Sequence, residues 1–113
     1  MSDCLFCSIV AGEIPATVVL RNDAVVAFRD IDPQAPVHVL VVPTQHFADI
    51  REVSTNAPEL TSTLIAAAAE VAEIEGVAGA YRLVFNTGAE AGQSVFHVHG
   101  HILGGRNLTW PPG

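Results

Sequence analysis

The chain has 113 residues, of which 50% are hydrophobic, and this is enough to bury one apolar core without disulfide support. Five Arg, no Lys and twelve acidic residues give a net charge of −7, which repels nucleic-acid backbones and anionic membrane surfaces. No apolar run reaches the roughly 18 residues that indicate a membrane span. We therefore expect a single domain, residues 1–113, that binds neither nucleic acid nor membrane.

The N-terminal stretch MSDCLFCSIVAG has no basic start and no long apolar segment, so it does not match a signal peptide. We expect a cytoplasmic protein, in which two cysteines serve as thiols or metal ligands rather than as a disulfide. The segment from Cys4 to Gly12 predicts a short helix or turn that ends at the glycine.

The next segments predict strands. TVVLRNDAVVAFRDI is typical of two strands around a turn at Asn22 and Asp23, whose short polar side chains suit turns. DPQAP is a proline-bounded loop. VHVLVVP is a dense run of β-branched residues, which predicts a buried central strand that ends at Pro43.

One long helix is predicted over PELTSTLIAAAAEVAEIEG, because apolar residues recur there at spacings of three and four. We expect Thr55 or Asn56 to cap its start and Gly76 to end it. The apolar stripe consists of Leu60, Leu64, Ala67, Ala68, Val71 and Ile74.

YRLVFN and SVFHVHGHIL predict two closing strands, joined by the loop TGAEAG. Strands on both sides of one long helix indicate an α+β fold: a mainly antiparallel sheet of about five strands, covered on one face, with a short N-terminal helix. The tail NLTWPPG is irregular. Its Trp110 is costly to expose, so we expect it to dock on this subunit or on a partner.

Three of the five histidines, His97, His99 and His101, stand at alternate positions and would share one face of a strand. The outer two would be roughly 13 Å apart, which is too far for all three to share one metal ion easily. A row of titratable groups favours a functional site over a polar strand face. A neutral imidazole can attack phosphorus, and a cationic neighbour can stabilise the charge that develops on the oxygens.

Cys4 and Cys7 have the spacing with which two thiolates reach one metal ion. The pair is also compatible with redox activity or with two buried thiols. The redox interpretation requires a βαβ context, which the sequence pattern lacks. A zinc site needs two more ligands, and His46, outside the histidine row, is a natural third.

The stretch GQSVFHVHGHILGG resembles the signature of the histidine triad family, in which three histidines alternate with hydrophobic residues. The resemblance extends to IPATVV, DIDPQAPVHVLVVP, YRLVFNTG and the ending WPPG. The combination looks like the branch of histidine triad nucleotide-binding proteins, which are homodimeric purine nucleoside phosphoramidate hydrolases. It implies a histidine triad fold and a homodimer that cleaves purine nucleoside phosphoramidates or related adenylates to AMP without a catalytic metal.

The resemblance also implies a role for each matching residue. His99 would attack the α-phosphorus and form a nucleotidyl-histidine intermediate, which water then resolves. The others would contact phosphate or leaving group (His101, Ser94), support the row (His38), position the phosphate (Asn86, Gln93) or line the nucleoside pocket (Asp30, Ile31). Without the resemblance, ordinary turn and capping roles would explain Asn86, Ser94 and Asp30 better.

The arrangement of these cysteines and histidines resembles that of some bacterial histidine triad proteins, in which two such cysteines, a histidine after the VP strand and the first triad histidine hold zinc. That resemblance implies a zinc site made by Cys4, Cys7, His46 and His97, which is structural because four protein ligands close it. Gly100 departs from the family, which usually carries a bulky apolar residue there. We expect a larger neighbour, for instance from the long helix, to fill the space.

Other functions stay open at this point. A metallohydrolase with a histidine pair on zinc would lose turnover on chelation. A nucleotide-binding or scaffold module with vestigial catalysis would bind AMP without turnover that depends on His99. Hydrolysis of dinucleoside polyphosphates is a near variant of the leading hypothesis, although Ser94 and the WPPG ending resemble the phosphoramidate branch more.

Overall fold

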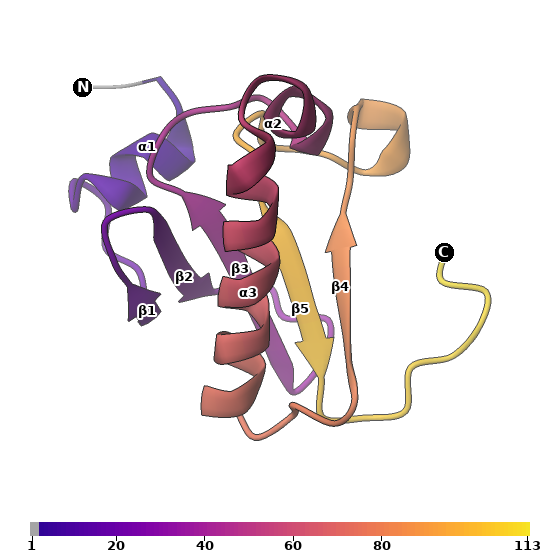
Figure 1. The fold of residues 1–113 in the computed structure, drawn as a ribbon. Helices are drawn as coiled ribbons and strands as arrows, with labels where there is room; N and C mark the ends of the chain where they lie inside the picture. Colours follow the sequence, from indigo (N-terminus) through magenta and orange to yellow (C-terminus); the bar gives the residue numbers. More distant parts are fainter. Residues whose placement is uncertain (1–2) are drawn as a thin grey trace.

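The computed structural model describes residues 3–113, which form an antiparallel sheet with helices on both faces (Figure 1). The strands are β1 (Val18–Arg21), β2 (Val25–Arg29), β3 (Val37–Pro43), β4 (Tyr81–Phe85) and β5 (Gly100–Gly104), in the order β1-β2-β3-β5-β4. The helices are α1 (Leu5–Val10), α2 (Ile50–Asn56), α3 (Pro58–Ile74) and the single 3-10 turn η1 (Ala89–Ala91). The predicted α+β fold with a five-stranded sheet is confirmed.

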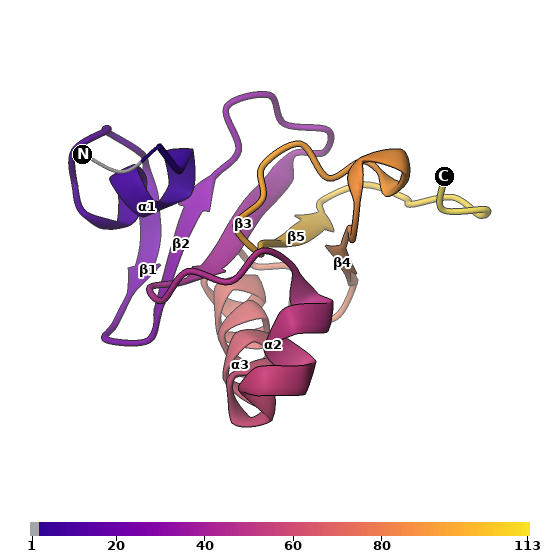
Figure 2. The same ribbon diagram turned by 90° about the horizontal axis from the view of Figure 1, so that it is seen from above.

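Two apolar layers follow from the alternation of side chains along the central strands. Figure 2 shows α2 and α3 on one face of the sheet and α1 on the other. The α3 side buries Val25, Ala27, Val39, Val41, Leu64, Ala67, Ala68, Val71, Val98 and Ile102. The α1 side buries Phe6, Ile9, Val26, Phe28, Leu40 and Val42. Because β2 and β3 are covered on both faces, their sequences are nearly continuous apolar runs.

The hairpin between β1 and β2 turns where the sequence predicts. The side chain of Asn22 accepts hydrogen bonds from the backbone N–H groups of Ala24 and Val25, both at 2.9 Å. A short side-chain oxygen that satisfies two turn amides is the reason why asparagine favours such positions. Pro43 is the last residue of β3, as predicted.

Helix α2 was not predicted, and it overturns the expected cap of the long helix. Thr55 and Asn56 lie inside α2, which starts at the N-cap Asp49. No side chain of the described residues caps α3, which follows Ala57 directly and begins with Pro58. Proline suits this place because it has no N–H to leave unpaired. At the other end Gly76 adopts a φ of 76°, beyond the end of α3 as predicted.

The apolar stripe of α3 is shorter than predicted. Leu64 and Val71 are fully buried, but Ile74 is 52% exposed and is not part of the core. Ile74 lies at the margin of the stripe in the last turn, where Ala72 is buried instead.

The closing strand is also shorter than predicted. Strand β5 begins at Gly100, so His97 and His99 precede it rather than lie within it. The backbone N–H of Val98 donates to the carbonyl of Phe47 at 2.8 Å, in a contact outside the strand ladder. The chain therefore bends before β5, and His97 points to a different place from His101.

Large neighbours do fill the space at Gly100, but they come from β4 and not from the long helix. A Cβ atom on Gly100 would lie 2.9 Å from Leu83 Cδ1 and 2.9 Å from the ring of Phe85. Phe85 is the direct cross-strand partner of Gly100 in the β4–β5 ladder. The glycine therefore makes room for an aromatic ring on the adjacent strand.

The C-terminal tail crosses the outer strand β4. Arg82 donates to the carbonyls of Leu108 and Thr109 at 3.2 and 2.6 Å, and its guanidinium lies 5.8 Å from the centre of the Trp110 ring. Trp110 is still 79% exposed, so it does not dock into the core of this subunit. Docking on a partner stays a prediction. Among residues 3–113 we find no helix with the length and apolar character to cross a membrane.

Candidate catalytic cleft and metal-binding group

A cleft of about 770 Å³ opens on the α1 side of the sheet. Its walls are mainly apolar and include Phe6, Ile9, Phe28, Leu40 and Val95. Asp30, Ser94, His99 and His101 add polar groups to this lining. An apolar pocket with a few converging polar groups is the usual form of a small-molecule site.

Backbone hydrogen bonding fixes the proton of His99. Its Nδ1 lies 2.8 Å from the carbonyl oxygen of His97, which can only accept, so Nδ1 carries the hydrogen and Nε2 has a lone pair. The ring is 7% exposed. Burial lowers the pKa of His99 below its usual value, against the opposing effects of this hydrogen bond and of Asp30. His99 therefore presents a neutral imidazole with an unprotonated Nε2.

His38 and His101 form a chain with a defined direction. The backbone N–H of Gln34 donates to His38 Nδ1 at 3.0 Å, so the ring proton of His38 must be on Nε2. That Nε2–H donates to His101 Nδ1 at 2.9 Å. The proton of neutral His101 is therefore on Nε2, on a ring that lines the cleft.

Burial, together with the neighbouring His99 and His38, lowers the pKa of His101 to about 4. The resting site therefore has a neutral donor at His101, where the sequence led us to expect a cationic neighbour beside the nucleophile. A protonated His101 would also carry a hydrogen on Nδ1, facing the Nε2–H of His38, so the hydrogen-bonded chain favours the neutral ring.

Asp30 and Ile31 follow β2 at the edge of the cleft. One carboxylate oxygen of Asp30 accepts from the N–H of Asp32 at 2.8 Å, and the other lies 3.5 Å from His38 Nε2. Asp30 thus touches the His38–His101 chain. The side chain of Ile31 is fully exposed at the rim.

The loop before the triad carries the remaining predicted residues. Ser94 lines the cleft, whereas Asn86 and Gln93 are not among the described residues that line it. Gln93 is 3% exposed, accepts from the N–H of Gly88, and donates to the carbonyls of Ala48 and Val95. Its side chain is therefore committed to backbone groups of this loop and of the segment between β3 and α2, which carries Ala48. Asn86 lies beside Gly92 in the same loop.

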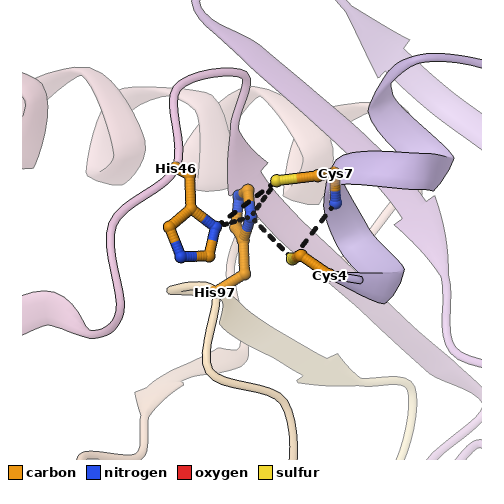
Figure 3. Close-up of side chains that lie close together, drawn as sticks. All are labelled: Cys4, Cys7, His46 and His97. Atoms are coloured by element: carbon orange, nitrogen blue, oxygen red, sulfur yellow. Dashed lines mark hydrogen bonds between the residues drawn. The ribbon is translucent and has the colours of Figure 1, made fainter. Parts of the chain in front are cut away.

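The four predicted zinc ligands lie close together at the start of α1 (Figure 3). Cys4 and Cys7 come from α1 and its cap, His46 from the loop after β3, and His97 from the bend before β5. His97 Nδ1 lies 3.4 Å from each sulfur and 3.1 Å from His46 Nδ1. Cys7 Sγ is 3.4 Å from His46 Nδ1. We call these four residues the metal-binding group.

The donor set fits a tetrahedral zinc ion. Zinc bonds of about 2.0–2.1 Å to nitrogen and about 2.3 Å to sulfur require edges of about 3.3 Å between nitrogens and about 3.6 Å between nitrogen and sulfur. The observed separations are 3.1 Å and 3.4 Å. His97 Nε2 donates to the carbonyl of Pro43 at 2.9 Å, which leaves Nδ1 unprotonated toward the sulfurs. The backbone N–H of Cys7 donates to Cys4 Sγ, which stabilises a thiolate.

A second cluster, Asp30, His38 and His101, is close enough for a metal ion but has the wrong protonation. A metal on His38 Nε2 would force the ring proton onto Nδ1, where it would oppose the N–H of Gln34. This cluster is therefore better described as a proton-carrying chain.

Sequence reasoning missed the contacts that set these roles. Three are backbone groups, from Gln34, Pro43 and His97, and residue types carry no signal for them. The fourth is Phe6, whose ring packs at 90° on His99 with centroids 4.9 Å apart. An apolar residue between two predicted metal ligands was the available signal.

Known proteins are similar to this chain over nearly its whole length. A HIT hydrolase of known structure from Legionella pneumophila superposes with a TM-score of 0.94 and 50% identity, covering 98% of this chain and 100% of that one. An uncharacterised HIT-like protein of Synechococcus elongatus is 46% identical, over 98% of this chain and 97% of its own length.

Two plant relatives carry more specific names. A protein of Arabidopsis thaliana named adenylylsulfatase HINT1 is 41% identical over 99% of this chain and 78% of its own length. A 14 kDa zinc-binding protein of Zea mays is 42% identical over 99% of this chain and 89% of its own. Residues 11–108 match the model of the HIT domain. The chain therefore belongs to the histidine triad, or HIT, family.

Proposed function

We propose that this chain is a nucleotidyl hydrolase, which cleaves purine nucleoside phosphoramidates or related adenylates to AMP through a covalent intermediate on His99. The names of the structural neighbour, a HIT hydrolase, and of the Arabidopsis relative, an adenylylsulfatase, support hydrolysis of adenylates. The observation that carries the proposal is the pair His99 and His101. The two rings line one cleft with centroids 4.9 Å apart, one with a free lone pair and one with an N–H.

The proposed reaction has two steps. His99 Nε2 attacks the α-phosphorus, the phosphorus–nitrogen bond breaks, and the amine leaves with a proton taken from water. Water then attacks phosphorus, the bond to Nε2 breaks and returns its electron pair to His99, and one proton of the attacking water passes to the solvent. The N–H of His101 stabilises the charge on the phosphate oxygens. His38 supports this role because it donates to His101 Nδ1.

The cleft suits a purine nucleoside. The apolar wall accepts a nucleobase, and Asp30 at the rim can accept hydrogen bonds from ribose hydroxyls next to the exposed Ile31. We assign Ser94 to the leaving group. Asn86 and Gln93 contribute to phosphate positioning through the loop that carries Ser94, because the amide of Gln93 bonds the backbone of that loop.

We further propose that the metal-binding group holds structural zinc. The tetrahedral spacing supports this, as does the name of the maize relative, a zinc-binding protein. Four protein ligands leave no open position for substrate, so zinc would add stability and fix α1 against the bend before β5. The cleavage itself needs no catalytic metal.

A cytoplasmic homodimer completes the proposal. The family resemblance implies a dimer, and the exposed aromatic rings of Phe96 (52%) and Trp110 (79%) are surfaces that a partner would cover. Size-exclusion chromatography with light scattering measures the mass directly. A monomer at micromolar concentration would contradict this part of the proposal and leave the hydrolase untouched.

The decisive experiment is hydrolysis of adenosine 5′-phosphoramidate by wild type and His99→Ala. We expect wild type to form AMP and, after rapid acid quench, to carry a nucleotidyl mass on the peptide with His99. His99→Ala should lose turnover by roughly 10⁴-fold or more, since removal of a nucleophile is among the largest single effects in catalysis. AMP binding without turnover in wild type would instead identify a binding module.

Addition of a chelator distinguishes the proposed hydrolase from the alternative metallohydrolase, in which a histidine pair would hold a catalytic zinc ion. If turnover stopped as soon as a chelator was added, while the fold measured by circular dichroism was unchanged, a catalytic metal would replace nucleophilic catalysis. We expect only a slow loss of activity that follows the loss of the structural metal.

A further inference from the structure

Phe6 is the single aromatic residue of α1, and it stands between the two cysteines of the metal-binding group. Its ring is 5% exposed and meets His99 at 4.9 Å and 90°. It also meets His97 at 6.1 Å and Phe28 at 5.4 Å. Phe6 therefore connects the metal-binding group to the nucleophile proposed above.

Helix α1 has six residues and is too short to be stable on its own, because isolated helices shorter than about 12–15 residues are marginal in water. Its position thus depends on tertiary anchors. Cys4 and Cys7 lie at its start, on both sides of Phe6 in sequence, and both sulfurs face His97 Nδ1. A metal ion on these ligands would fix the backbone that carries Phe6.

The hydrogen bond from His99 Nδ1 to the carbonyl of His97 restrains the tilt of the ring, but it is a single contact. The ring needs a second contact to keep Nε2 directed into the cleft. Phe6 supplies that contact in the edge-to-face geometry that aromatic pairs prefer. His101 bounds another side, with centroids 4.9 Å apart.

We propose that Phe6 is a positioning residue for His99, and that the metal-binding group acts on the reaction through it. This inference rests on the proposed function, in which His99 is the nucleophile. Metal on Cys4 and Cys7 holds α1, α1 holds the Phe6 ring, and the ring keeps His99 in the orientation for attack. The metal-binding group then contributes to the rate as well as to the stability of the fold.

The first test compares Phe6→Leu with the matched control Phe28→Leu. Both residues are buried aromatics of the cleft wall, but the ring contact with His99 belongs to Phe6. We expect Phe6→Leu to lower kcat for adenosine 5′-phosphoramidate by about 10- to 100-fold, the range for a misplaced reacting group. Phe28→Leu should mainly raise KM. Equal effects of the two variants on kcat would overturn the proposal.

The second test needs no substrate and no variant. Long-range proton–nitrogen spectra of the wild-type protein report the tautomer of each histidine. With zinc bound we expect His99 to show one tautomer, protonated on Nδ1, and after dialysis against chelator we expect an average of two. His38 is the internal control, because its partners Gln34 and His101 lie outside the metal-binding group. An unchanged His99 signal without metal would overturn the proposal even if Phe6→Leu failed to fold.

A combined variant separates positioning from general stability. If the metal acts through Phe6, then Cys7→Ser should lower kcat much less in the Phe6→Leu background than in wild type. Additive losses would show two independent effects and refute the coupling. Wild-type turnover in His99→Ala would instead refute the proposed function, whereas a dead His99→Ala beside a fully active Phe6→Leu would refute only this inference.

Discussion

His97 and His99 are two residues apart, have the same side chain, and are both almost fully buried, yet the structure prepares them for different chemistry. The carbonyl of Pro43 accepts from His97 Nε2, which leaves Nδ1 with a lone pair that can bind a metal ion. The carbonyl of His97 accepts from His99 Nδ1, which leaves Nε2 with a lone pair for the proposed attack on phosphorus. The two residues differ only in which ring nitrogen donates a hydrogen bond to a backbone carbonyl.

The comparison extends to the regions around the two residues. In the metal-binding group, lone pairs of four side chains converge on one point. His38, His99 and His101 each carry one N–H and one lone pair, and the hydrogen bonds of these rings fix which nitrogen has the proton. Converging lone pairs need a cation, and alternating donors and acceptors do not.

The largest expected effects come from replacing His99 and His97 one at a time, because each replacement should abolish a different property. His99→Ala should retain one zinc per chain and near wild-type stability while turnover falls by roughly 10⁴-fold. His97→Ala should lose the metal and up to about 4 kcal/mol of unfolding free energy, the linkage value when free metal is about 1,000-fold above Kd. Metal analysis, urea denaturation and turnover measure all three properties. Loss of zinc from His99→Ala would break the distinction.

Removing the donor to His101 should have the next largest effect. His38→Leu deletes the N–H that fixes the tautomer of His101, and we expect kcat to fall by about 10- to 100-fold, as for other outer-shell partners of functional histidines. His38→Gln keeps an amide N–H and should lose less. Zinc content should be unchanged in both variants, and equal activities of the two would argue against the donor role.

Gly100→Ala should disturb the region of His99 and His101 and leave the metal-binding group unchanged. The new Cβ would meet Leu83 and Phe85 at 2.9 Å, so we expect a loss of about 1–3 kcal/mol in unfolding free energy and a lower kcat, since His99 and His101 flank the position. Gly79→Ala is the control, because a Cβ there meets nothing within 4 Å. Full activity and stability of Gly100→Ala would show that the side chains of Leu83 and Phe85 can move away from the new Cβ at little cost in free energy.

The last expected effect, which concerns stability and not turnover, is a pH dependence from His101. Its pKa is about 4 in the folded chain and 6.5 when unperturbed, so protonation favours the unfolded state. The contribution is complete above pH 6.5, falls as the pH decreases toward 4, and levels off below. The difference in unfolding free energy between wild type and His101→Gln isolates it across this range. A difference that is constant with pH would contradict the depressed pKa.

Much of the site could be predicted from residue types and spacings. Cys4, Cys7, His46 and His97 do lie together, and His99 and His101 do share a cleft with Asp30 and Ser94. These patterns are informative because few side chains bind metal or titrate near neutral pH, so their clustering is unusual. Helix α2 and the start of β5 were not predictable in the same way, because a short capped helix and a bend leave no periodic signal.

By itself, the sequence determined the order of the five strands, the short N-terminal helix and the long helix along the chain. It also determined the antiparallel sheet and the set of chemically competent side chains, because these follow from local periodicity and residue chemistry. Only the tertiary structure decided which ring nitrogen of His97 and of His99 keeps its lone pair. The carbonyl of Pro43 lies 54 residues from His97 in sequence. Phe6 reaches His99 only because α1 packs on the face of the sheet opposite α3. Contacts of this kind arise from folding, and no local pattern encodes them.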